Sequence, residues 1–162
     1  MKFKLSPFEK KDLVIAWLAL AAAFTLGASG ILAVFMQGFS ALSPEKMLLT
    51  FVIALITVGL SFVLHELAHK FAAIKFGYWA EFRKSPQMLV IAVAVAVITG
   101  IVFAAPGATV INTAGRPLSK RENGIISVSG PLVNVLLIIP FAVIMFVGIF
   151  LGGVDAVAGG LF

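Results

Sequence analysis

The stretch MLLTFVIALITVGLSFVLHELAHKFAAIKFG, from Met47 to Gly77, has the composition of a membrane helix but contains both histidines of the chain. Ser43 and Pro44 supply an N-cap and a first turn, and Gly77 is a natural C-cap. The helix would be about 46 Å long, which exceeds the roughly 30 Å of a bilayer's hydrocarbon core. His65 would lie about 27 Å along it, close to one membrane boundary. Imidazole and charge are costly in lipid, so the pattern indicates a functional site.

The composition of the whole chain is that of an integral membrane protein. Of its 162 residues 61% are hydrophobic and 12% charged, whereas soluble domains have about 25% charged residues. We expect one domain over residues 1–162. The absence of cysteine excludes disulfides, thiolate metal sites and a cysteine nucleophile. Four apolar blocks cover most of the chain: Leu13 to Met36, Met47 to Leu64, Met88 to Ala105 and Ile125 to Leu151.

The basic residues predict the orientation. The net charge of +5 comes from lysines and arginines between the apolar blocks, which is typical of cytoplasmic loops and not of a nucleic-acid groove. We therefore expect no nucleic-acid partner and a cytoplasmic N-terminal segment over residues 1–12. This segment carries four lysines: Lys2, Lys4, Lys10 and Lys11.

The block from Met88 to Ala105 either spans the membrane or re-enters it. A re-entrant segment would keep Arg116, Lys120 and Arg121 on the cytoplasmic side, which the positive-inside rule favours. The following PGATVINTAGRP predicts a short strand or hairpin connector. The expected fold class is an all-α polytopic membrane protein, with three transmembrane helices, one re-entrant or spanning segment and a short β connector.

The five residues HELAH match the H-E-x-x-H pattern. His65 and His69 would project from one helix face and hold one zinc ion, with Glu66 as general base toward the attacking water. The alternatives are a polar cluster between helices, or a simple Glu66–Lys70 pair. Because both histidines occur at this one spacing, we favour the metal site.

A catalytic zinc ion normally has three protein ligands, so a carboxylate is needed. Glu81 and Glu122 could lie on the correct side, but EFRK and KREN predict solvated loops. No carboxylate is assigned from the sequence. The candidates are Glu9, Asp12, Glu45, Glu81, Glu122 and Asp155.

The chain resembles the site-2 protease family of intramembrane zinc metalloproteases. The resemblance rests on HELAHKFAA at His65 to Ala73, on GPxxN at Gly130 to Asn134 and on FAAPGATV between them. It implies that His65 and His69 bind zinc and that Glu66 is the catalytic base. It also implies that Gly130 and Pro131 pack near the site, and that Asn134 helps to position substrate or water.

The resemblance further implies a function, a location and a departure from the family. Members hydrolyse peptide bonds in or near transmembrane segments of other membrane proteins, so the expected partners are such substrates and the bilayer. The active site would lie near the cytoplasmic side. Their third ligand is an aspartate in a DG pair beyond GPxxN, which is missing here. We therefore expect a chain truncated at its C-terminus, with the third ligand beyond Phe162 and no activity of its own.

Two other functions remain open at this point. One is a membrane-anchored zinc peptidase with a glutamate as third ligand, although no glutamate follows Glu122. The other is a metal-free scaffold that binds partner helices through the small residues Ala23, Gly27 and Gly30. The oligomeric state is open.

Overall fold

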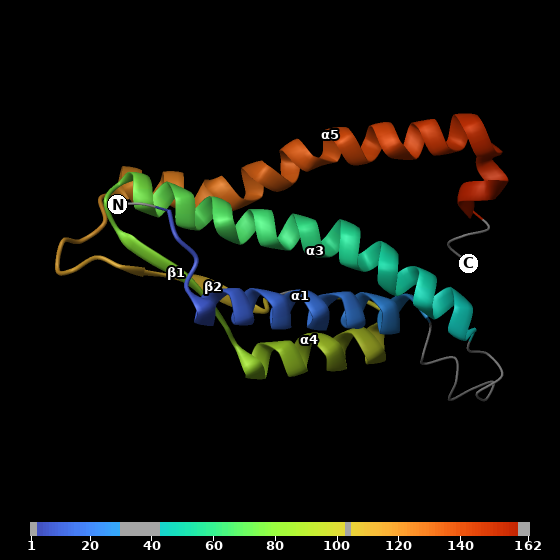
Figure 1. Cartoon of the computed structure of the whole chain (residues 1–162), viewed down its shortest axis with the longest axis horizontal. Helices are drawn as coiled ribbons and strands as arrows, with labels where there is room; N and C mark the ends of the chain where they lie inside the picture. The colour runs from blue at the N-terminus through green and yellow to red at the C-terminus, as the bar shows by residue number, and fades with distance from the viewer. Residues whose placement is uncertain (1–2, 30–42, 103–104, 159–162) are drawn as a thin grey trace.

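Figure 1 shows the computed structural model, which describes residues 3–29, 43–102 and 105–158, with side chains as far as residue 151. Four helices and two strands follow one another along these residues. They are α1 (Pro7–Ala28), α3 (Pro44–Lys75), β1 (Trp79–Lys84), α4 (Pro86–Thr99), β2 (Gly107–Asn112) and α5 (Lys120–Ala158).

A Ser-Pro pair begins three of the helices. Ser6, Ser43 and Ser85 each accept a hydrogen bond from the backbone N–H three residues further on, at 3.1 to 3.4 Å. The proline that follows each serine lacks an N–H and has the helical φ angle, so it fits the first turn. The first helix therefore begins at Pro7, before the apolar block that starts at Leu13. The end of that block, from residue 30 to Met36, lies outside the described residues.

Three of the helices are long and apolar enough to cross a membrane, namely α1, α3 and the part of α5 from Lys120 to Leu151. The helix α1 packs between α3 and α4, and α5 packs against another side of α3 (Figure 1). A core cluster that includes Leu13, Leu20 and Phe62 joins α1 to α3. The predicted fold class, with three transmembrane helices and a short β connector, is confirmed.

The segment between the two strands enters and returns at the same end of the molecule. β1 and β2 pair antiparallel with Lys84 opposite Gly107, and the Ser85 N–H donates to the Pro106 carbonyl at 2.8 Å. Between them α4 has 14 residues, or about 21 Å, which is too short to span. The helix ends at Gly100, whose φ of +73° is accessible to glycine. The segment is therefore re-entrant.

A buried ion pair fixes this sheet to the helices. The Lys70 ammonium on α3 pairs with the Glu9 carboxylate on α1, and both side chains are almost fully buried. The second Glu9 oxygen accepts the Phe82 N–H at 3.1 Å. Phe82 in turn packs edge-on against Phe62, with 5.5 Å between ring centroids. One carboxylate thus joins α1, α3 and β1.

The prediction that EFRK forms a solvated loop is wrong. These residues belong to β1, and Glu81 is only 4% exposed. Its carboxylate accepts hydrogen bonds from the Ser6 hydroxyl and from Arg83, whose Nη2 lies 2.5 Å from Oε2. The charge of Glu81 is therefore neutralised inside the protein by Arg83. The sequence EFRK alone does not indicate this burial.

The small residues proposed as a scaffold surface are covered within the chain. Ala23 has no exposed area, and a Cβ on Gly27 would lie 3.2 Å from the Gly100 carbonyl oxygen. These two positions of α1 are therefore not free to bind a partner helix, because α4 packs where Gly27 lacks a side chain. Gly30 lies outside the described residues.

Gly59 sets the contact between α1 and α3. The Trp17 indole of α1 donates to the Leu55 carbonyl of α3 at 2.8 Å, and it fills the space where a Cβ of Gly59 would stand. We expect Gly59→Ala to destabilise the protein by about 1–3 kcal/mol through overpacking, measured as a lower thermal midpoint in detergent. Gly148→Ala is the matched control, because a Cβ there meets nothing within 4 Å. Equal midpoints for the two variants would contradict this packing.

Candidate metal centre

The two histidine side chains meet on one face of α3. Their Nε2 atoms are 3.0 Å apart, and the ring planes are inclined by 80°. Two nitrogen ligands of a tetrahedral zinc ion at 2.0–2.1 Å would be about 3.3 Å apart. The observed separation is close to that value, so His65 and His69 fit a shared metal ion with little rearrangement.

The remaining nitrogen of His69 is held by α5. His69 Nδ1 lies 2.7 Å from the Ile126 carbonyl oxygen, which can only accept a hydrogen bond. Nδ1 therefore carries the proton, and Nε2 keeps its lone pair. Metal-binding histidines commonly have such a carbonyl partner on the second nitrogen. The Ser129 hydroxyl donates to the same carbonyl at 2.7 Å.

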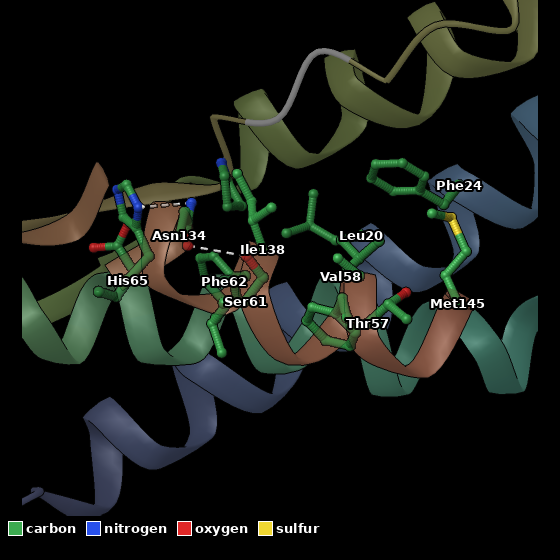
Figure 2. A pocket seen from close by; sticks show the side chains of 15 residues that line it. Leu20, Phe24, Thr57, Val58, Ser61, Phe62, His65, Asn134, Ile138 and Met145 are labelled. Carbon is green, nitrogen blue, oxygen red and sulfur yellow. Dashed lines mark hydrogen bonds between the residues drawn. The ribbon is translucent and has the colours of Figure 1, made fainter. Parts of the chain in front are cut away.

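The remaining nitrogen of His65 is held by Asn134, also on α5. The Asn134 amide nitrogen lies 3.1 Å from His65 Nδ1, and its oxygen accepts the Ser61 hydroxyl at 2.9 Å. Figure 2 shows the amide between His65 and Ser61. A half-turn of the amide would present its oxygen to His65 Nδ1 and its NH₂ to Ser61. In that orientation His65 also keeps a lone pair on Nε2.

Gly130 brings the backbone of α5 against both rings. A Cβ at this position would stand 2.6 Å from His65 Nε2 and would also overlap His69 Nε2. Only glycine leaves this space open, and it is the space between the two metal-facing nitrogens. Pro131 follows inside the helix and is exposed. The two motifs singled out in the sequence, HELAH and GPxxN, therefore lie side by side.

The start of α5 is held against the end of α3 by a polar cluster around Tyr78. Arg116 donates to the Tyr78 hydroxyl at 3.0 Å and to Glu122 at 2.9 Å, and Tyr78 donates to Glu122 at 3.1 Å. The hydrogen bond to Tyr78 raises the pKa of Arg116 above its usual value. The guanidinium links Tyr78 to Glu122 and so holds α5 where it can reach the histidines.

Glu66 lies beside the histidines and contacts the sheet. It is 9% exposed, and its Oε2 accepts the hydroxyl of Thr109 on β2 at 2.9 Å. Lys70 is not its partner, because Lys70 pairs with Glu9. The alternative of a simple Glu66–Lys70 pair is therefore wrong.

No third protein ligand joins the histidines within the described part of the chain. Glu9, Asp12, Glu81 and Glu122 are each engaged by a lysine or arginine elsewhere. Glu45 lies in the first turn of α3, at the opposite end of that helix from His65. The side chain of Asp155 lies outside the described residues.

A pocket of about 690 Å³ extends from His65 between α1, α3 and α5. Figure 2 shows His65 and Asn134 at one end and Phe24 and Met145 toward the other, and Glu66 also lines the pocket. The walls between these ends are mostly apolar side chains, which suits an apolar segment next to a polar reaction centre.

Sequence reasoning did not identify three groups that support the site. These are the Ile126 carbonyl, the Ser61 hydroxyl and the Thr109 hydroxyl. Ser61 lies one helical turn before His65, so its spacing is a usable signal. The other two depend on contacts between segments far apart in the chain, for which the sequence has no local signal.

Comparison with known proteins identifies a relative among the curated proteins. The chain is 35% identical over 145 residues, or 90% of its length, to a protein of Methanocaldococcus jannaschii named as a putative zinc metalloprotease. It spans 66% of that protein's length. No protein-family model matches the chain, and no solved structure matches it significantly. At this identity and coverage, the chain is a homologue of a protein named as a zinc metalloprotease.

Proposed function

We propose that the chain forms the catalytic part of an intramembrane zinc metalloprotease of the site-2 protease type. The observation that carries the proposal is the pair of Nε2 atoms 3.0 Å apart, with Glu66 beside them. The name of the archaeal homologue supports a zinc metalloprotease. The position of the pair on an apolar helix long enough to span supports action inside the membrane.

In this proposal, His65 and His69 hold the zinc ion and Glu66 transfers protons. The metal, when bound, polarises the scissile carbonyl and makes water more acidic. Glu66 lines the pocket next to the histidines, so its carboxylate can take the proton from the attacking water. It can then deliver that proton to the amine that leaves. Asn134 and Ile126 keep both imidazoles oriented, so that their Nε2 lone pairs face the metal.

The proposed substrates are transmembrane segments of other proteins, cut near the cytoplasmic boundary. The apolar pocket can accept lipid-soluble side chains beside the scissile bond. The basic residues of the N-terminal segment, β1 and the start of α5 gather at the end where the strands lie (Figure 1). The positive-inside rule makes that end cytoplasmic.

An unwound substrate segment would pair with the sheet in this proposal. β2 is paired to β1 along one edge and has no strand on its other edge among the described residues. An extended peptide can add to such an edge through main-chain hydrogen bonds. This part of the proposal fails if proline substitutions throughout Met88 to Ile111 leave cleavage unchanged.

We expect His65→Ala to remove zinc, and Glu66→Gln to retain zinc but lose cleavage. The first variant deletes a ligand, and the second deletes only the group that accepts the proton. Zinc is measured by elemental analysis of the full-length protein in detergent, and cleavage with a single-span reporter protein that has a Gly-Pro pair near its cytoplasmic boundary. A Glu66→Gln protein that cleaves at the wild-type rate would exclude the proposed enzyme.

The 162-residue chain should bind zinc weakly, because among the residues that the structure describes two histidines leave the ion one ligand short. Isothermal titration with zinc should therefore show an affinity well below that of a zinc site with three protein ligands. Tight stoichiometric binding that His65→Ala abolishes would instead show that this chain supplies the third ligand itself.

Asn134→Leu should lower zinc affinity about 10- to 100-fold, because His65 loses the partner of its Nδ1 atom. Asn134→Asp should retain most of the affinity, since a carboxylate accepts from the same nitrogen. Asn123→Leu, at an exposed position of the same helix, is the matched control. If Asn134→Leu slows cleavage with unchanged zinc affinity, then Asn134 acts on substrate or water, as the family resemblance implies.

A further inference from the structure

The Glu66 carboxylate accepts a side-chain hydrogen bond from Thr109, a residue that has no role in the proposed mechanism. Thr109 on β2 donates its hydroxyl to Glu66 Oε2 at 2.9 Å, and the same hydroxyl lies 3.3 Å from the Glu66 backbone oxygen. We propose that Thr109 is the positioning residue of Glu66, which rests on the proposed function. It holds one carboxylate oxygen so that the other faces the pocket.

The sheet delivers the Thr109 hydroxyl to a fixed place. Thr109 lies opposite Phe82 in the antiparallel register, and Phe82 is bound through its N–H to the buried Glu9 carboxylate. Gly107 sets how closely the strands approach, because a Cβ there would lie 2.7 Å from the Lys84 Cα atom. A slip of one residue would turn Thr109 to the other face of the sheet and remove the hydrogen bond.

Thr109 leaves one carboxylate oxygen available. Within the described part of the chain, Glu66 Oε1 has no hydrogen-bond partner, whereas Oε2 has Thr109. A general base acts fastest when its reactive oxygen is already held in the productive geometry. The Thr109 hydroxyl supplies this restraint from a strand, which is more rigid than a loop.

The hydroxyl, and not the bulk of the side chain, is the group that matters. Valine has nearly the shape of threonine without the hydroxyl, and serine retains the hydroxyl without the methyl group. If Thr109 only filled space, valine would replace it well and serine would not. If it positions Glu66, the reverse holds.

The test uses the full-length protein in detergent with zinc and the single-span reporter described above. We expect Thr109→Val to lower kcat about 10- to 100-fold, in the range found when a group that orients a catalytic ligand is removed, with KM changed by less than about twofold. Zinc content and the thermal midpoint should match the wild type. Thr109→Ser should restore most of the lost kcat.

Two controls separate positioning from folding. Thr99→Val removes a hydroxyl that donates to the Val95 carbonyl on α4 and has no hydrogen bond to Glu66, so it should leave kcat unchanged. In a Glu66→Asp background we expect the shorter carboxylate to lose the hydrogen bond from Thr109. There, Thr109→Val should have little further effect on kcat.

Several results would overturn the inference. One is wild-type kcat in Thr109→Val, and another is a change confined to KM. If Thr109→Val loses zinc or thermal stability, the Thr109→Ser variant decides. A wild-type kcat in Thr109→Ser supports the role of the hydroxyl, and an equal loss of zinc or stability refutes it.

The failure of this inference can be told apart from the failure of the proposed function. If Glu66→Gln abolishes cleavage while Thr109→Val does not slow it, only this inference fails. If the wild-type protein neither binds zinc nor cleaves the reporter, the proposed function fails and the inference with it.

Discussion

The buried ion pair between Glu9 and Lys70 is the interaction on which the remaining structure depends. Removing one partner would leave an uncompensated charge in a medium of low dielectric constant, which costs about 3–5 kcal/mol. The pair joins α1 to α3, and Glu9 also binds the Phe82 N–H of β1. Because β2 pairs with β1, the same carboxylate indirectly fixes where Thr109 meets Glu66. An ion pair outside the candidate metal centre thus helps to determine the position of Thr109 relative to Glu66 within that centre.

Local patterns in the sequence predicted the helices and the metal-facing residues, because their physical causes are local. The spacing of His65 and His69 places both on one helix face, and Ser43 with Pro44 marks the start of α3. The re-entrant segment was predicted as one of two alternatives, from the positions of the basic residues. Helix length and the Ser85–Pro106 hydrogen bond then identified it.

Features that depend on distant contacts were not predictable in this way. Strand β1 was not predicted, because its charged residues are typical of a solvated loop. In the structure Glu81 pairs with Arg83 and accepts a hydrogen bond from Ser6. The family resemblance implied a role for Asn134 in positioning substrate or water, but its contact with His65 depends on how α5 packs against α3. Thr109 has no sequence signal, since a threonine in a strand is ordinary.

The hydrogen bond from Ser85 to Pro106 has a consequence for how the chain can vary. Because the two ends of this segment are hydrogen-bonded to each other, the chain enters and leaves it on the same side of the membrane. A change in its length therefore does not alter the orientation of the helix that follows. A spanning helix inserted at the same place would invert α5 and carry Gly130 away from the histidines. The hydrogen-bonded ends thus preserve the topology, while the packing of α4 against α1 limits which residues the segment can contain.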